Sequence, residues 1–596
     1  MKNPFEVNTP EGISAKEVHE LFVDVFTDFY QVPEIGHTFL NGPRGSGKSM
    51  MFRYMMPDCQ KIDRNCGLNE LNYFSLYAPI KLTDINYPEL DRLKDSSNTF
   101  FNEHLLTTYV ASKCFKSILQ YKDDFDKCLT EIKDFYRNTF LWYVDISGQN
   151  IENYKVEFDN PVSYFERVIK ILDEIFLKCK TYCKKVALSP SLPLEYNGPL
   201  CNYLDFLYPI LLELKKLSFF PKDKPIFLLV DDAGYLNETQ TKILNTWVSY
   251  RTSKDISIKI STQLDYKTLK TVTNKTIDSP HDYSQVNIAT VYTTPNNNYY
   301  KRIERIVSKR IEKYLEKKIA PTDFFPFDAD QEKEIEEIKA KLKIEFSNPN
   351  KSYAGGDAAR RYATSEYVKR LKGSRAGSHY NYAGFDNLVD VSSGIIRHFL
   401  EPATRMFSNH ISRNEIQIPD IDHIPVMVQD SIIKEYSSSF LENEFQKVIE
   451  EHGHKNENER LSKADKLYNL IIGLGQMFHR IFVSDRAERI VFSVALNDMP
   501  DNELKEIIDL AEHYGYLHKS SIGNKQGTGR CRLYILSRTL SPYFKLDPAG
   551  FKGYKFMNSS VLKISLTDPM KFEREANKTL SNGDEDQQLS LLTELE

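Results

Sequence analysis

The chain has 596 residues, of which 41% are hydrophobic, and a formal net charge of −5 at pH 7. The apolar content is typical of a globular protein, and the length exceeds one hydrophobic core, which indicates about three or four domains. A slightly negative charge excludes a global positive field, so any nucleic-acid contact must come from a local basic patch.

The eight cysteines are scattered and form no C-x-x-C pair. This pattern favours buried, reduced thiols over a metal site. The residues after Met1 lack the apolar core of a signal peptide, and no apolar run is long enough to cross a bilayer. We therefore expect a cytoplasmic protein that does not span a membrane.

A first helix is predicted over residues 15–30, and a short apolar strand follows it. A glycine-rich turn follows the strand. The spacing of its Gly42, Gly47, Lys48 and Ser49 fits the phosphate-binding P-loop. Glycines let the backbone approach phosphates, Lys48 would reach the β- and γ-phosphates, and the Ser49 hydroxyl would bind Mg²⁺. An ordinary glycine-rich turn is the alternative, but the flanking strand and helix favour a nucleotide site. We expect ATP to contact Gly42, Pro43, Arg44, Gly45, Ser46, Gly47, Lys48, Ser49 and Met50.

A second strand is predicted at 72–80, and residues 95–215 carry apolar positions at helical spacing. This pattern indicates a large helical insertion between two strands of the nucleotide-binding fold. Its apolar residues are most simply core. A protein partner would bind its exposed faces, although the sequence singles out no face.

Residues 226–232 are five apolar residues followed by two acids. This pattern is typical of a buried parallel strand that delivers carboxylates to a metal. We expect Asp231 to hold Mg²⁺ and Asp232 to orient or deprotonate the attacking water. An acidic N-cap after a core strand is the alternative.

The strand at 255–263 ends in small polar residues. In P-loop enzymes of the additional-strand type, one strand lies between the strand before the P-loop and the strand that carries the acids. A polar side chain on this intervening strand contacts the γ-phosphate and the attacking water. We expect Thr262 to do this, and Ser261 and Gln263 are the next candidates. Strand-end capping is the alternative.

A last strand at 285–291 and a helix at 299–315 complete an α/β domain with a parallel sheet, residues 1–316. Residues 317–380 are predicted to be a charged linker or insertion, with a helix at 330–346 and a polar loop at 348–356. Its basic cluster, with Tyr362 and Tyr367 interleaved, is either an exposed helix face or a contact to phosphate backbone.

Residues 381–485 are predicted to form a helical lid and connecting helices. One helix ends near Gly394 and the next begins with Arg397 in its first turn, where a cation is disfavoured unless it serves an anion. A surface arginine is the alternative. The pattern thus suggests that Arg397 serves the nucleotide.

Residues 486–560 are predicted to form a winged helix, and a polar, acidic tail at 577–596 is predicted to be disordered. Positive charge on the wing hairpin suggests DNA contacts. The helix at 502–513 is acidic, which argues against deep insertion into the major groove and leaves a protein-contact or lid role open. The DNA-contact candidates are Lys519, Lys525, Arg530 and Arg532.

With these motifs in order, the chain resembles the origin-recognition-complex type of AAA+ ATPase over roughly residues 1–90, 220–316 and 380–545. The resemblance implies an α/β P-loop AAA+ domain with a large helical insertion, a helical lid and a C-terminal winged helix. It also implies that Thr262 is the sensor-1 residue and that Arg397, in the sensor-2 segment, touches the γ-phosphate. Arg310 and Arg251 are the main candidates for an arginine finger.

The family usually has Asp-Glu where this chain has Asp231 and Asp232. The shorter second acid would slow hydrolysis or favour a bound-state switch, and signalling ATPases of the STAND type share the two-aspartate form. We expect a Mg²⁺-dependent ATP-binding and ATP-hydrolysing protein, with slow turnover, that couples nucleotide state to homo-oligomerisation and DNA binding. The alternative is a STAND-like switch that binds a protein partner. Composition and resemblance suggest a bacterial protein of an antiviral or accessory-replication system.

Overall fold

The computed structural model describes all residues except 1, 8, 25–28, 126–127, 190–193, 251–253, 264–265, 289–298, 346–351, 374–379, 415–417, 456–459, 485–490, 524–529, 550–552 and 579–596. The chain forms two compact units. The sheet unit comprises Asn8–Gly42 and Gly47–Ile288, and the lid unit comprises Met1–Val7, Pro43–Ser46 and Ala289–Glu596.

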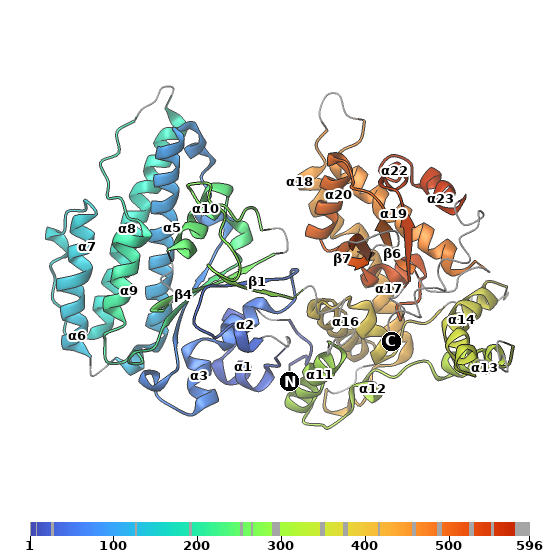
Figure 1. Ribbon diagram of the computed structural model, residues 1–596. Coiled ribbons are helices and arrows are strands. Elements are labelled where there is room, and N and C mark those ends of the chain that lie inside the picture. Colours follow the sequence, from blue (N-terminus) through green and yellow to red (C-terminus); the bar gives the residue numbers. More distant parts are fainter. Residues whose placement is uncertain are drawn as a thin grey trace. The chain divides into compact units, whose positions relative to one another are not determined.

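The sheet unit is built on five parallel strands in the order β2-β3-β4-β1-β5 (Figure 1). Strands β3 and β4 are buried along their whole length, which explains their nearly continuous apolar sequence. The strands are β1 (Thr38–Asn41), β2 (Phe74–Pro79), β3 (Ile226–Asp231), β4 (Ile256–Thr262) and β5 (Ser284–Asn287). The predicted parallel α/β architecture is confirmed.

The predicted helical insertion between β2 and β3 is also confirmed. Helices α5 and α8 pack against each other through a core that includes Leu105 and Cys183 (Figure 1). The helices of the sheet unit are α1 (Ala15–Leu21), α2 (Lys48–Tyr54), α3 (Pro57–Arg64), α4 (Leu82–Ile85), α5 (Asp95–Ile118), α6 (Leu129–Asp134), α7 (Leu141–Ile146), α8 (Pro161–Leu188), α9 (Tyr208–Leu214) and α10 (Glu238–Ser249). Among the described helices, none combines the length and the apolar character needed to cross a bilayer.

The helix predicted over residues 15–30 is shorter than expected, because α1 ends at Leu21. Phe22 has extended backbone angles, with φ −60° and ψ 131°. Its ring stacks on Tyr54 with 3.8 Å between centroids. This tertiary contact outweighs the helical spacing of the following apolar residues.

From Tyr299 to Phe482 the described residues of the lid unit are mostly helical, with helices before and after the turn at Gly394. They are α11 (Tyr299–Leu315), α12 (Pro321–Phe324), α13 (Ala329–Glu345), α14 (Ser352–Gly373), α15 (Phe385–Val391), α16 (Ile396–Asn414), α17 (Val426–Glu442), α18 (Phe445–His452) and α19 (Lys463–Phe482). The loop predicted at 348–356 is wrong from Ser352 onwards, where α14 begins. Packing of α14 on α13 through residues such as Ile338 and Tyr367 outweighs the low helix propensity of Gly355 and Gly356.

The C-terminal part of the lid unit contains the predicted winged-helix strands and helix. Its sheet has the order β7-β8-β6-β9, in which the unpredicted strand β9 runs parallel to β6. The elements are β6 (Val491–Leu496), α20 (Asn502–His513), β7 (Leu517–Gly523), β8 (Arg530–Leu536), α21 (Ser541–Phe544), β9 (Gly553–Met557), α22 (Ser559–Ile564) and α23 (Pro569–Lys578). Because α23 reaches Lys578, the predicted disordered tail overlaps the end of a helix, and its remainder lies outside the described residues.

Phe5, in the first segment of the chain, lies in the core of the lid unit. Its side chain is fully buried and contacts Phe324, Phe325 and Phe407, with 5.4–6.1 Å between ring centroids. The Thr404 hydroxyl donates to the Phe5 carbonyl at 2.7 Å. The lid unit therefore assembles from segments that are far apart in the sequence.

Candidate nucleotide-binding site

The predicted P-loop connects β1 to α2. Gly45 (φ +85°) and Gly47 (φ +98°) adopt left-handed backbone angles, which favour glycine. Lys48 is 6% exposed, and its ammonium group donates to the Gly42 carbonyl at 2.7 Å. The first N–H groups of α2 have no partners within the helix. They are oriented to receive an anion held by the loop.

Asp231 lies at the end of β3 with only 1% of its surface exposed. The Tyr77 hydroxyl donates to Oδ2 at 2.8 Å, the Ser261 hydroxyl donates to Oδ1, and the Asp232 N–H lies 3.1 Å from Oδ1. An ionised carboxylate offers about four lone-pair sites. Three donors therefore hold the carboxylate in place and leave about one site for a metal ion or its bound water.

Asp232 lies just beyond the strand. Its backbone is left-handed, with φ 58° and ψ 40°, a conformation that aspartate tolerates better than most residues. Its N–H also donates to the Ser261 hydroxyl at 2.9 Å. Asp232 is half-buried beside the fixed carboxylate. Its role in orienting or deprotonating water stays a prediction.

Strand β4 lies between β1 and β3, as expected for a P-loop protein of the additional-strand type. Thr262 pairs with Asn41, and its carbonyl accepts from the Gly42 N–H at 3.2 Å, so it lies at the base of the P-loop. Its hydroxyl donates to the Gln263 carbonyl at 3.1 Å. Ser261 rather than Thr262 contacts Asp231, and the sensor-1 role of Thr262 stays a prediction.

The oxygen donors of this site suit magnesium. Hydroxyl and carboxylate oxygens, here from Ser49 and Asp231, are the ligands that Mg²⁺ prefers, and the ion usually completes its shell with phosphates and water. In the described part of the chain no three His, Cys, Asp or Glu side chains cluster as a metal site. The residues thus fit a magnesium ion that a nucleotide brings with its phosphates.

The predicted break between two lid helices is confirmed. Helix α15 ends at Val391 and α16 begins at Ile396, with Ser393 (φ 54°) and Gly394 (φ 77°) forming the turn between them. Within the lid unit, the Arg397 N–H donates to the Gly45 carbonyl at 3.2 Å. The half-buried Arg397 guanidinium has no hydrogen bond or ion pair with any described residue. It is therefore suited to an anionic ligand.

Residues of the winged helix hold the turn before Arg397. The Arg538 N–H donates to the Ser393 hydroxyl at 3.2 Å, and the Thr539 hydroxyl donates to the Val391 carbonyl at 3.1 Å. The Arg538 guanidinium lies 3.4 Å from Asp390. Burial raises the pKa of Asp390 to about 7, although the Arg538 charge acts in the opposite direction. This link between lid and winged helix gave no recognisable sequence signal.

The candidate DNA contacts fall into three groups. Arg530 and Arg532 are exposed on β8, and Arg530 donates to the Ser521 carbonyl at 3.1 Å. Lys519 is engaged by two acids of α20, lying 2.6 Å from Asp509 and also contacting Glu512. Lys525 lies outside the described residues. Among the described residues of the hairpin, Arg530 and Arg532 are therefore the exposed cations that form no ion pair with a carboxylate.

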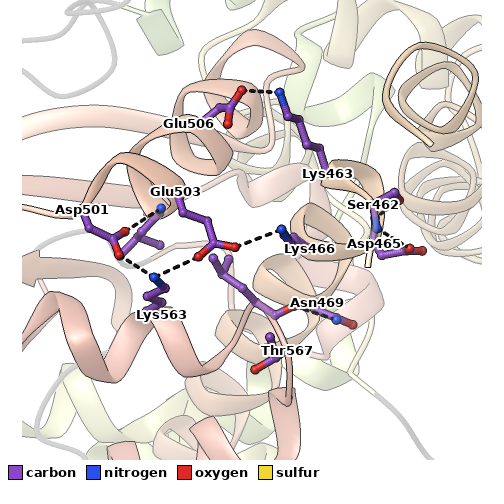
Figure 2. A network of polar contacts seen from close by, with 12 residues as sticks. Ser462, Lys463, Asp465, Lys466, Asn469, Asp501, Glu503, Glu506, Lys563 and Thr567 are labelled. Atoms are coloured by element: carbon purple, nitrogen blue, oxygen red, sulfur yellow. Dashed lines mark hydrogen bonds and ion pairs between the residues drawn. The ribbon is translucent and has the colours of Figure 1, made fainter. Parts of the chain in front are cut away.

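The acids at the start of α20 are ion-paired within the lid unit (Figure 2). Glu503 lies 2.9 Å from both Lys466 of α19 and Lys563 of α22. Glu506 pairs with Lys463, and Asp501 pairs with Lys563. These acids attach α20 to its neighbouring helices, which argues further against α20 as a groove-reading helix.

Of the two arginine-finger candidates, the structure describes Arg310. The Arg310 guanidinium donates to the carbonyls of Pro4 at 2.8 Å and Glu6 at 3.2 Å. It therefore contributes to holding the first segment of the chain. Arg251 lies outside the described residues, and both assignments stay predictions.

A P-loop, a carboxylate at the end of β3 and an intervening strand β4 define a P-loop protein of the additional-strand type. A family model described as ORC-CDC6-like matches residues 3–556. The chain belongs to this family of AAA+ ATPases, and the predicted resemblance is confirmed. No curated protein matches the sequence.

Two solved structures are similar over most of the chain. One is the Aeropyrum pernix Orc1 protein in complex with DNA, with 9% identity, 88% of this chain and 91% of that chain covered, and a TM-score of 0.25. The other is Cdc6p from Pyrobaculum aerophilum, with 11% identity, 94% and 98% covered, and a TM-score of 0.24. At such low scores the family assignment rests on the family model.

The close approach of Gly45 to Arg397 gives a testable prediction. A Cβ at residue 45 would lie 2.7 Å from the Arg397 Cβ, so Gly45→Ala should lower the free energy of unfolding by roughly 2–4 kcal/mol through strain and overpacking. Gly515→Ala is the matched control, because Gly515 has φ +78° and open space around the added Cβ. Denaturant unfolding of both variants checks this. Equal losses would contradict the close packing of Gly45 on Arg397.

Proposed function

We propose that this chain binds ATP with Mg²⁺ and hydrolyses it slowly. The observation that carries the proposal is the pairing of a left-handed glycine P-loop with a buried, triply hydrogen-bonded carboxylate at the end of β3. Family membership supports the same activity. Ser49 and Asp231 would hold the Mg²⁺ ion, which would supply positive charge to neutralise the phosphates.

Four residues would have separate roles in hydrolysis at the γ-phosphate. Asp232 would orient the attacking water, and Thr262 would contact the γ-phosphate from β4. Lys48 and Arg397 would stabilise the negative charge that develops as the bond to the leaving oxygen breaks. An aspartate in place of glutamate reaches less far, which supports slow turnover.

We further propose that nucleotide state is passed to the winged helix and to homo-oligomerisation. Arg397 follows directly on the turn that Arg538 and Thr539 hold, so a shift of Arg397 toward a phosphate would move groups that contact the winged helix. Duplex DNA would then meet the exposed Arg530 and Arg532. The expected bacterial antiviral or accessory-replication setting stays a prediction.

A second function, a STAND-like signalling switch, is favoured by one observation. The acids of α20 and Lys519 of the wing hairpin are engaged with one another or with neighbouring lysines. In such a switch the winged helix only packs, ATP stays bound, and the helical insertion binds a protein partner. ATP retained through purification, with no DNA affinity at low salt, would support it.

Removal of the Lys48 ammonium group tests the nucleotide site. Lys48→Ala should weaken ATP binding at least about 100-fold, because a charge-assisted contact to the phosphates is removed. Isothermal titration with ATP and Mg²⁺ measures it. Lys61→Ala, which removes a lysine paired with Asp124 on the sheet unit, is the charge-matched control. Undiminished ATP binding by Lys48→Ala would overturn the site.

Removal of the Arg397 guanidinium tests the sensor-2 assignment. Arg397→Ala should lower kcat about 100-fold or more and change ATP affinity little, because its contact strengthens as charge develops on the γ-phosphate. Single-turnover hydrolysis and ATP titration separate the two effects. Arg413→Ala, an exposed arginine on the same helix, is the control. An unchanged rate in Arg397→Ala would remove the assignment.

DNA binding is tested by its dependence on salt. If Arg530 and Arg532 contact phosphates, the double Arg→Ala variant should weaken duplex binding and reduce the slope of log K against log [salt] by about 2. The variant Lys463→Ala/Lys563→Ala removes the same charge from the network in Figure 2. Fluorescence anisotropy at several salt concentrations measures both. Equal slopes for the hairpin variant and wild type would favour the signalling switch.

A further inference from the structure

Tyr77 of β2 reaches the metal-holding carboxylate from a neighbouring strand. In the parallel pairing of β2 with β3, Pro79 lies opposite Asp231 and Tyr77 lies opposite Leu229. Successive side chains alternate between the faces of a sheet, so Tyr77 projects on the face of Pro79, diagonally behind Asp231. A long side chain can span such a diagonal. The Tyr77 hydroxyl donates to Asp231 Oδ2 at 2.8 Å.

The first helix of the insertion fixes Tyr77 in this position. Strand β2 is at the edge of the sheet, so its outward backbone groups have no neighbouring strand. Helix α5 supplies partners for them instead. The Tyr77 N–H donates to the Ser117 hydroxyl at 3.3 Å, and the Tyr109 hydroxyl donates to the Pro79 carbonyl at 2.8 Å.

The other oxygen of the carboxylate is held from the opposite side. Ser261 of β4 donates to Oδ1, together with the Asp232 N–H. Without the Tyr77 hydroxyl, Oδ2 would lose the donor that fixes the rotation of the carboxylate about its last side-chain bond. Groups that orient a metal-binding carboxylate typically change metal affinity about 10–100-fold when they are removed.

We propose that Tyr77 is a positioning residue for the magnesium-holding carboxylate of Asp231, and that α5 keeps Tyr77 in place for this role. The proposal rests on the proposed function, because it assigns a task to Tyr77 only if Asp231 holds the ion. It gives the helical insertion a defined connection to the metal site. Tyr77 acts through Asp231 and is not itself a catalytic residue.

The test is the dependence of nucleotide binding on free Mg²⁺. Binding of a fluorescent ATP analogue is measured in EDTA and at increasing free Mg²⁺ for wild type and Tyr77→Phe. We expect the Mg²⁺ concentration at the midpoint of the metal-dependent gain to rise about 10-fold or more in the variant. Affinity in EDTA should not change, because the P-loop contacts are intact.

Tyr73→Phe is the matched control. Tyr73 immediately precedes β2, and its ring stacks on Phe227 with 4.4 Å between centroids, a contact that phenylalanine retains. We expect its Mg²⁺ midpoint to equal that of wild type. Ser117→Ala, which removes the acceptor for the Tyr77 N–H on α5, should raise the midpoint in the same direction by a smaller factor.

The outcomes distinguish a failure of the proposed function from a failure of the role assigned to Tyr77. If wild type binds no ATP analogue with or without Mg²⁺, the proposed function fails. If wild type shows a Mg²⁺-dependent gain and Tyr77→Phe has the same midpoint, the role of Tyr77 is overturned. An effect of Tyr77→Phe without any effect of Ser117→Ala would retain Tyr77 and overturn the part assigned to α5.

Discussion

The site depends on one geometric constraint: parallel strands deliver their carboxyl ends to a common edge of the sheet. The order β2-β3-β4-β1-β5 places β4 between the P-loop strand and the strand of Asp231. Residues that are almost two hundred positions apart in sequence therefore contribute to one polar edge. The extensive burial of β3 and β4 makes that edge rigid, so a carboxylate there can be held by several hydrogen bonds.

In the lid unit, the turn before Arg397 combines two left-handed residues with contacts from the winged helix. Deforming this turn would weaken several hydrogen bonds together, because each weakens steeply as its angle departs from linear. Ser393 is the central residue, since its hydroxyl accepts from the Arg538 N–H and also lies 3.3 Å from His518 Nε2. The lid helix and the wing hairpin thus share a small set of polar groups.

The sequence allowed the P-loop, the acids of β3, the helical insertion and the turn at Gly394 to be predicted, because each has a local pattern with a physical cause. Three features were not predictable in this way. Helix α1 stops early because Phe22 stacks on Tyr54, a contact between separate segments. Strand β9 is only five residues long and begins with Gly553, a residue type depleted in strands, so its sequence does not distinguish it from a loop. Tyr77 contacts Asp231 only through strand register, which a single sequence does not reveal.

The burial of Phe5 has a consequence for how the chain folds as it is synthesised. Phe5 leaves the ribosome hundreds of residues before Phe324, Phe325 and Phe407, the aromatic rings that cover it in the folded lid unit. During that interval the residues of the sheet unit emerge and can collapse, while the Phe5 side chain has no aromatic rings to pack against. A nascent chain in which such a contact forms late exposes a hydrophobic segment, and exposed hydrophobic segments are what holding chaperones recognise.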